Sequence, residues 1–212
     1  MKKILLATVV AISFAMPNAF AENANNSSAY VGVDTGAAFI KDDSQASAQS
    51  LVNTNGGSAI VVQDLRSLVG RIYAGYHINK TFAVELGYLA SGDYKETATG
   101  ISSGVVYGRD TKISFSGLDY SLLIRPSESL NGLFVKVGGH SIGTSVDYTS
   151  VNMISSSGSS KINGTGYLVG VGYQEQLSSA IDARVAYTYY NKVSGVSESN
   201  INALTIGVLV KF

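Results

Sequence analysis

The sequence predicts an all-β protein, an eight-stranded antiparallel up-and-down β-barrel that crosses a membrane. Three observations support this prediction. The chain begins with an export signal, its apolar residues recur with a period of two, and long polar connectors alternate with short ones. The composition agrees, because 23 glycines, 13 tyrosines and only 14% charged residues suit strands better than helical bundles.

The first 21 residues have the features of a secretory signal peptide. Two lysines precede an apolar run, Ile4 to Met16, and a small-residue cleavage site of the A-x-A kind ends at Ala21. The run is too short to span a hydrocarbon core of ~30 Å, which takes ~20 helical residues. We expect cleavage after Ala21, which leaves residues 22–212 as the barrel domain. An exported chain without a later helical span can still cross a membrane as a closed barrel.

The first four strands are predicted from alternation after the signal peptide. Ala29–Ile40 places valines on one face and glycines with an aspartate on the other. Arg66–Ile78 alternates aliphatic residues and tyrosine with arginine, glycine and histidine, and Phe82–Ser91 follows the same rule. The fourth strand, about Lys112 to Arg125, alternates clearly only in its second half, and we expect a bulge at Gly117.

The last four strands alternate more regularly. Gly132 to about Thr144 sets leucine and valine against lysine, glycine and histidine. Gly164–Gln174 opposes valine and tyrosine to glycine, and Ile181–Tyr190 opposes valine and tyrosine to aspartate and arginine. The eighth strand contains Thr205–Phe212, whose alternate aliphatic residues and terminal phenylalanine are expected to face lipid.

The connectors alternate in length, as they do in outer-membrane barrels, where short turns face the periplasm and long loops face outward. The long connectors are Lys41–Leu65, Asp93–Thr111, Ser145–Asn163 and Asn191–Asn200, and the short ones lie near Asn79, at Pro126–Asn131 and at Glu175–Ala180. The four long connectors are therefore predicted to be exposed loops.

Composition excludes several kinds of partner and chemistry. Removal of the signal peptide leaves 13 basic against 15 acidic residues, so no basic footprint for nucleic acid is expected. The chain has no cysteine and only two histidines, which predicts no disulfide and no metal site. The glycine-rich stretches lack the lysine and the following helix of a phosphate loop, so no cofactor is expected.

Two internal stretches and the C-terminus resemble a known family. GYLVGVGYQEQLSSAIDARVAYTYY, Gly166–Tyr190, and GLFVKVGGHSIG, Gly132–Gly143, resemble the later strands of OmpA-like and opacity-type outer-membrane barrels. The C-terminus resembles the signal that is read by the outer-membrane assembly machinery, at Thr205, Gly207, Val210 and Phe212. The chain stops at the barrel, whereas full-length OmpA relatives carry a peptidoglycan-binding domain, so we expect no cell-wall tether.

The resemblance implies a location and partners. It implies the outer membrane of a Gram-negative bacterium, with outer-membrane lipids and lipopolysaccharide around the barrel. It also implies delivery by periplasmic chaperones and insertion by the barrel-assembly machinery.

Charged residues on the glycine-bearing face are predicted to point into the barrel. An eight-stranded barrel is only just wide enough for its side chains, so these charges are expected to pair. The acids are Asp34, Glu85, Asp119 and Asp182, and the bases are Arg71, Lys136, Arg184 and Lys211. The leading interpretation is a structural network that fills the interior. The alternative is a small gated pore in which Glu85, Lys136 and Arg184 exchange partners, by resemblance to small barrels.

The leading functional hypothesis is a non-enzymatic surface protein with a structural, adhesive or host-interaction role, its ligand bound by the long loops. His140 and Ser141 suggest a lipid-A-modifying barrel, but neighbouring residues of a strand point to opposite faces, so catalysis is not expected. A lipocalin-like exported barrel is a further alternative, with its apolar face turned inward.

Overall fold

Strands make up almost all of the described chain. The computed structural model describes residues 29–41, 58–64, 66–102, 105–126, 132–151, 157–193 and 199–212. The predicted signal peptide, with its cleavage site after Ala21, lies outside these residues. Within the described ranges, no helix is long and apolar enough to cross a membrane.

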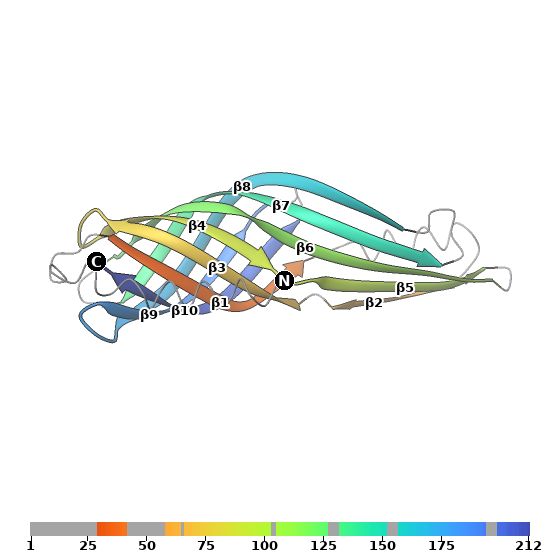
Figure 1. Ribbon diagram of the computed structural model, residues 1–212, viewed down its shortest axis with the longest axis horizontal. Coiled ribbons are helices and arrows are strands. Elements are labelled where there is room, and N and C mark those ends of the chain that lie inside the picture. The colour runs from red at the N-terminus through yellow and green to blue at the C-terminus, as the bar shows by residue number, and fades with distance from the viewer. Residues whose placement is uncertain are drawn as a thin grey trace.

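Eight passages of the chain close into an antiparallel barrel (Figure 1). In order around the barrel, the strands are β1 (Ala29–Lys41), β3 (Arg66–His77), β4 (Phe82–Ser91), β6 (Val105–Ile124), β7 (Leu133–Val151), β8 (Ser157–Gln176), β9 (Ile181–Tyr190) and β10 (Asn200–Lys211). β1 pairs with β10 from Tyr30↔Lys211 to Lys41↔Asn200, which closes the ring. The predicted fold class is confirmed, and the bounds of β4 and β9 match the prediction residue for residue.

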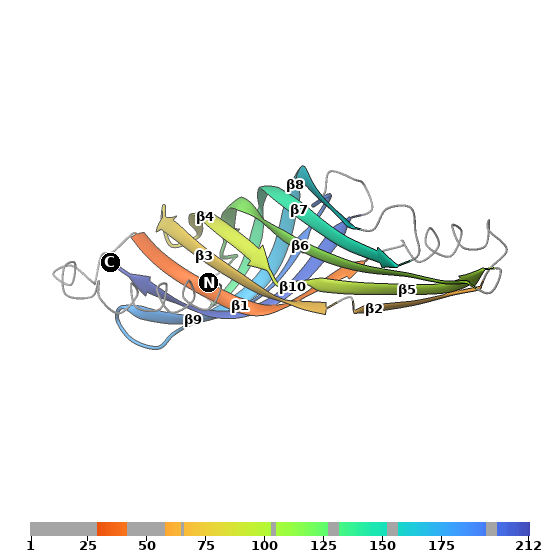
Figure 2. The same ribbon diagram turned by 45° about the vertical axis from the view of Figure 1, so that its right-hand side comes forward.

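Beyond the barrel, one side of the wall continues as a protruding sheet (Figure 2). It contains β2 (Ser58–Asp64), β5 (Tyr94–Ser102) and the distal parts of β6, β7 and β8, in the order β2-β5-β6-β7-β8. We use "protruding sheet" for these five segments. The C-terminus lies at the opposite end of the molecule (Figure 1).

The prediction of long loops is wrong where the strands of the protruding sheet form. β2 lies within the predicted loop Lys41–Leu65, β5 and the start of β6 occupy most of Asp93–Thr111, and β7 and β8 extend into Ser145–Asn163 from its two ends. The physical reason is that these strands rise beyond the apolar band. With water on both faces they need no apolar face, so the alternation that reveals a lipid-facing strand is weak there. Residues 42–57, 65, 103–104, 152–156 and 194–198 of the predicted loops lie outside the described residues.

The bulge expected at Gly117 is wrong. The β4–β6 register runs without interruption from Phe82↔Ile124 to Ala90↔Ser116, and the β6–β7 register also passes through Gly117 unbroken. Glycine is needed there for a different reason, since a Cβ atom would collide with the backbone of Ser141 and Ile142 on the neighbouring strand.

The short connectors lie at the end of the barrel opposite the protruding sheet. The side-chain oxygen of Asn79 accepts the amide hydrogens of Thr81 and Phe82, both at 2.8 Å, which forms a tight turn between β3 and β4. The turn between β8 and β9 spans Leu177–Ala180, where the Ser178 hydroxyl accepts the Ile181 amide hydrogen at 3.1 Å. Residues 127–131 of the predicted turn Pro126–Asn131 lie outside the described residues.

The outward face of the barrel is apolar. Leu68, Ile72, Tyr120 and Ile206 leave 75%, 45%, 62% and 64% of their surface uncovered by protein. In water such a surface would be costly, but against lipid it is the expected covering of a transmembrane barrel. This orientation also argues against the lipocalin-like alternative, which requires the reverse.

The interior consists of a charged layer between two apolar clusters. Along β1, the inward residues Tyr30, Asp34 and Ala38 belong in turn to the lower cluster, the charges and the outer cluster. The outer apolar cluster, toward the protruding sheet, comprises Ala38, Val69, Leu89, Tyr94, Phe115, Ile142, Leu168, Tyr190, Val193, Ile201 and Ala203. The lower apolar cluster, toward the short turns, comprises Tyr30, Tyr73, Ala83, Leu123, Phe134, Ala186 and Leu209.

Candidate functional site

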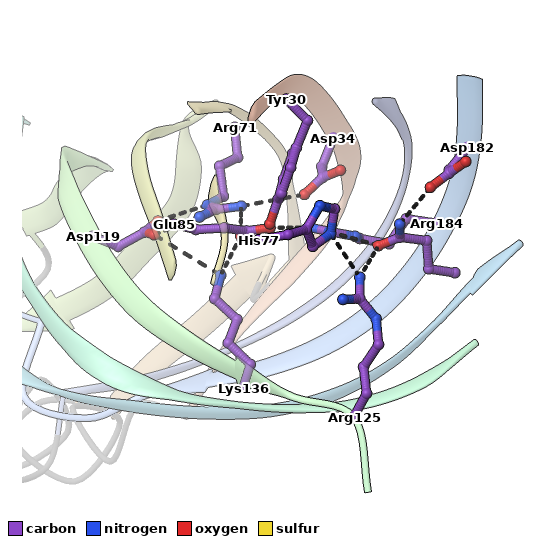
Figure 3. Close-up of polar contacts among 11 residues, drawn as sticks. Tyr30, Asp34, Arg71, His77, Glu85, Asp119, Arg125, Lys136, Asp182 and Arg184 are labelled. Carbon is purple, nitrogen blue, oxygen red and sulfur yellow. Dashed lines mark hydrogen bonds and ion pairs between the residues drawn. The ribbon is translucent and has the colours of Figure 1, made fainter. Parts of the chain in front are cut away.

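A network of six buried charges occupies the middle of the barrel (Figure 3). Its members are Asp34, Arg71, Glu85, Asp119, Lys136 and Arg184, none more than 4% exposed. Three acids face three bases, so the network is electrically balanced. Charge pairing is required at this buried position, because an unpaired buried charge costs several kcal/mol.

Arg71 joins the three acids. Its Nε and Nη2 atoms donate to the two carboxylate oxygens of Asp119, at 2.8 and 2.7 Å, in a bidentate pair. Its Nη1 atom donates to Glu85 Oε2 at 3.1 Å and lies 3.6 Å from Asp34 Oδ2. The register places Arg71 on β3 directly opposite Asp34 on β1, so strand pairing itself brings these two together.

Glu85 is the acceptor shared by most of the network. Its Oε1 atom accepts hydrogen bonds from Arg184 Nη1 at 2.6 Å and from the Tyr30 hydroxyl at 3.0 Å. Its Oε2 atom faces Arg71 at 3.1 Å and Lys136 Nζ at 4.0 Å. Lys136 also lies 3.9 Å from Asp119 and is therefore the most loosely held base.

Asp182 and Lys211, the remaining predicted charges, form a separate pair toward the short-turn end. Lys211 Nζ lies 2.7 Å from Asp182 Oδ1. Gln174 connects this pair to the central network, because it donates to Asp182 Oδ2 at 2.6 Å and accepts from Arg184 Nη2 at 2.8 Å. All eight charges predicted to face inward are thus inside, as six in one network and two in a linked pair.

Four polar residues take part in the network although the sequence analysis did not predict them as members of it. Tyr30 and Gln174 bond directly to the charges, while Arg125 donates to Gln174 at 3.5 Å and lies 3.2 Å from His77 Nε2. The His77 ring also lies against the Tyr30 ring, with centroids 4.7 Å apart. The alternation of their strands places these residues on the inward face, so parity alone could have found them.

Aromatic rings cover glycines on the inner wall and line the charges. A Cβ atom at Gly32 would collide with the Tyr73 ring, and one at Gly172 would collide with the Phe134 ring. The Arg184 guanidinium lies 5.0 Å from the centroids of both rings, a cation–π arrangement. Glycine on one strand therefore creates the space that an aromatic ring on a neighbouring strand needs.

The predicted assembly signal lies on the closing strand. Gly207 stands between Asp34 on β1 and Arg184 on β9, and a Cβ atom there would collide with the Asp34 carboxylate and the Val33 carbonyl oxygen. The Phe212 amide donates to the Ala29 carbonyl at 3.0 Å.

The other two members of this segment are also held by β-sheet contacts. Val210 pairs with Val31, and the Thr205 hydroxyl donates to the Ala186 carbonyl at 3.4 Å. These contacts give the segment a structural role, and recognition by the assembly machinery stays a prediction.

The outer apolar cluster closes the barrel above the charges. Val193, in the connection between β9 and β10, is only 2% exposed and packs with the inward residues of the wall. A cavity beside the network measures about 10 Å³, which is roughly the volume that one water molecule needs. Asp34, Arg71, Lys136 and Arg184 are among the residues that line it.

The His140–Ser141 pair does not form a catalytic dyad. His140 is 2% exposed, and its Nε2 atom lies 2.7 Å from the Asn191 carbonyl oxygen. Ser141, the next residue on β7, is exposed on the opposite face of the strand. Among the described residues, no group of three His, Asp or Glu side chains is placed to hold a metal ion.

Comparison with solved structures finds small outer-membrane barrels. Ail, the attachment invasion locus protein of Yersinia pestis, aligns with a TM-score of 0.54 and 11% identity over 88% of this chain and 99% of that chain. Neisserial surface protein A aligns with a TM-score of 0.42 and 20% identity, over 87% and 97% of the two chains. OprG from Pseudomonas aeruginosa gives 0.42 and 14%, over 88% and 97%. A search of the curated proteins found no match.

The family comparison covers nearly the whole chain. The model of the outer membrane protein β-barrel domain matches residues 5–212, which include every strand and all eight inward charges. Together with the closed eight-stranded barrel, this match indicates the outer membrane as the location. The chain belongs to the outer membrane protein β-barrel domain family.

Proposed function

We propose that this outer-membrane barrel is a non-catalytic surface protein that acts through its protruding sheet in adhesion or host interaction. The observation that carries the proposal is the contrast between the two parts of the molecule. The barrel interior is filled by paired charges between two apolar clusters, whereas the distal strands form a sheet beyond the barrel whose exposed residues include Ile60, Val62 and Ile101. The barrel is thus the anchor and the sheet the working surface.

The filled interior weighs against the pore alternative. Leu89, Ile142 and Leu168 are 0–1% exposed and lie across the barrel between the charges and the outside. An ion on this path would have to leave water for an apolar layer, which is strongly unfavourable. Exchange of partners among Glu85, Lys136 and Arg184 would not by itself open that layer.

The interior also weighs against the lipid-A-modifying alternative. Such an enzyme needs its nucleophile and base within hydrogen-bond reach of each other. Here His140 points inward to the Asn191 carbonyl oxygen, while Ser141 points to the other face of the wall.

The partners of the barrel follow from its surface and remain proposals. Its apolar outer face is suited to outer-membrane lipids, with lipopolysaccharide around the base of the protruding sheet. The closing strand offers Phe212 and Val210 to the barrel-assembly machinery after transit with periplasmic chaperones. A surface or host ligand would bind on the protruding sheet.

A shortened hairpin tests the proposed function. Val146 and Ser160 are direct cross-strand partners that exchange backbone hydrogen bonds, so an Asn-Gly turn can replace residues 147–159 without a change of register. We expect bacteria with this variant to lose attachment to host cells while the barrel still resists unfolding in unheated detergent. A matched control replaces Leu177 by serine in a short turn at the opposite end. Undiminished attachment by the shortened variant would contradict the proposal.

A further inference from the structure

Three exposed lysines lie on the outward face of the wall where the barrel passes into the protruding sheet. They are Lys95 on β5, Lys112 on β6 and Lys161 on β8, and we call them the lysine cluster. Tyr94 and Thr111, the residues before the first two, are buried toward the interior, so Lys95 and Lys112 point outward. Lys112 and Lys161 lie on either side of β7.

The pairing of Lys95 with Lys112 is unfavourable in the protein alone. The two residues are direct cross-strand partners, and like charges in that position destabilise a strand pair. No hydrogen bond or ion pair joins any member of the lysine cluster to another described residue. An anion bound between the lysines would relieve their repulsion.

The acids of the same face do not neutralise the lysine cluster. Asp110 lies two residues nearer the tip than Lys112 and accepts a hydrogen bond from the Thr97 hydroxyl at 2.8 Å. Asp147 is the strand partner of Lys112, but the two form no ion pair among the described contacts. Both acids lie at the level of Lys112 or beyond it, so the side of the lysine cluster that faces the membrane is positive.

The Lys161 side chain is directed toward the membrane. Its Cε atom lies 3.3 Å from the position that a Cβ atom would take on Gly143. Gly143 is two residues nearer the barrel along β7 than Ser145, the strand partner of Lys161. Because Gly143 has no side chain, the lysine stem can lie along the wall and present its ammonium group toward the base of the protruding sheet.

Neutral hydrogen-bonding groups lie between the lysines. Ser114 and Ser145 are direct partners on β6 and β7, and the Asn163 side-chain oxygen lies over Gly143. Lysine binds phosphate as a point charge, while hydroxyl and amide groups can hydrogen-bond to sugar hydroxyls. This combination suits a phosphorylated sugar.

The distance of the lysine cluster from the membrane favours a tall headgroup. On β6 and β8, Leu118 and Tyr167 are the last exposed apolar side chains of the outward face among the described residues. Lys112 and Lys161 lie six residues nearer the tip, which is roughly 15 Å along the membrane normal for a strand tilted by about 40°. A phospholipid headgroup layer is only about 5–7 Å thick. The phosphorylated sugars of lipopolysaccharide extend farther and come within reach of the lysines.

We propose that the lysine cluster, with Ser114, Ser145 and Asn163, binds phosphate groups on the sugars of lipopolysaccharide in the surrounding leaflet. Basic residues close to a membrane surface attract anionic headgroups in general. The inference rests on the proposed lipopolysaccharide surroundings of the barrel and does not depend on the adhesive role.

Urea unfolding in vesicles tests the site. The purified, folded protein is placed in phosphatidylcholine vesicles with an increasing share of rough lipopolysaccharide, and unfolding is followed by gel mobility. A ligand that binds only the folded state raises the urea midpoint. We expect Lys112→Gln and Lys161→Gln each to need about fivefold more lipopolysaccharide for half of this rise.

Arg109→Gln is the matched control. It removes one positive charge from the same strand as Lys112, but on the opposite face, where the guanidinium lies over the Tyr148 ring. This variant should need the same share of lipopolysaccharide as the unchanged protein. An equal requirement in the lysine variants, the control and the unchanged protein would overturn the proposal.

The like-charge pair provides a second test, in which the sign of the effect depends on the lipid. Without lipopolysaccharide, Lys95→Gln should unfold at the same or a higher urea concentration than the unchanged protein, because the repulsion is removed. With lipopolysaccharide it should unfold at a lower concentration, because a phosphate ligand is lost. Equal destabilisation in both lipids would show a purely structural lysine and contradict the proposal.

Two further probes identify the source of the anion. Lipopolysaccharide stripped of its phosphates should produce little of the rise, and an undiminished rise would show that phosphate is not recognised. Heparin, a soluble polyanion, should not raise the midpoint in vesicles without lipopolysaccharide. A rise equal to that given by lipopolysaccharide would assign the lysine cluster to a soluble ligand and overturn its assignment to the membrane.

The outcome is separable from host attachment. If all variants need the same lipopolysaccharide while the shortened hairpin abolishes attachment, the phosphate site is wrong and the adhesive role stands. If the lysine variants behave as expected but the shortened hairpin still permits attachment, the phosphate site stands and the adhesive role is wrong.

Discussion

Replacing Glu85 by glutamine should remove the central acceptor of the charge network with little change in shape. In the structure Glu85 accepts from Arg184 at 2.6 Å, from Arg71 at 3.1 Å and from Tyr30 at 3.0 Å. The amide oxygen could keep one of these donors, but the amide nitrogen would face a second donor. Three buried bases would then share two acids. Removing one partner of a buried ion pair costs about 3–5 kcal/mol.

That loss corresponds to a factor of roughly 100 to 4,000 in the folding equilibrium constant, at about 1.4 kcal/mol per tenfold change. The assay is reversible urea unfolding in lipid vesicles, followed by the different gel mobility of folded and boiled protein. Glu175→Gln is the matched control, because Glu175 is exposed and bonds only to Tyr173 among the described contacts. A loss below about 1 kcal/mol for Glu85→Gln would refute the claim that the network is a buried, mutually dependent unit.

Three further predictions concern other parts of the barrel. Deletion of Phe212 should reduce insertion in cells more than refolding in detergent, and equal losses would show that the residue matters for packing alone. Gly207→Ala should destabilise the barrel by about 1–3 kcal/mol in the same urea assay, because its Cβ meets the Asp34 carboxylate, and unchanged stability would remove this steric argument. His140→Ala should leave the mass spectrum of lipid A unchanged but lower stability by about 1–3 kcal/mol, because the Asn191 carbonyl loses its donor. Altered lipid A would restore the enzyme hypothesis.

The barrel could be predicted from the sequence in the membrane-spanning part of the strands, where contact with lipid requires an apolar residue at every second position. Inside the membrane the outward residues of these strands are apolar at every second position, so the bounds of β4 and β9 follow from alternation even though some inward residues, such as Leu89, are apolar too. The inward placement of Asp34, Glu85 and Arg184 follows from the same rule. The strands of the protruding sheet do not contact lipid and need no such alternation, which is why they were predicted to be loops.

Which inward side chains contact one another was harder to predict than which residues face inward. Strand parity places Glu85 and Arg184 on the inner face, but their 2.6 Å contact joins strands that are not neighbours in the sheet. Such a contact depends on barrel diameter and on rings such as Tyr73 and Phe134, which direct the long side chains. The seal by Val193 likewise depends on the fold of a connector that carries no alternation.

If the interior is a closed structural filling, the proposed function must lie on the outer surface of the protein. Planar-bilayer recording with the purified, folded protein tests this most directly, with folding confirmed by the gel shift on heating. We expect no stepwise conductance above that of the protein-free bilayer at any applied voltage that the bilayer tolerates. Reproducible single-channel steps from the folded protein would contradict it.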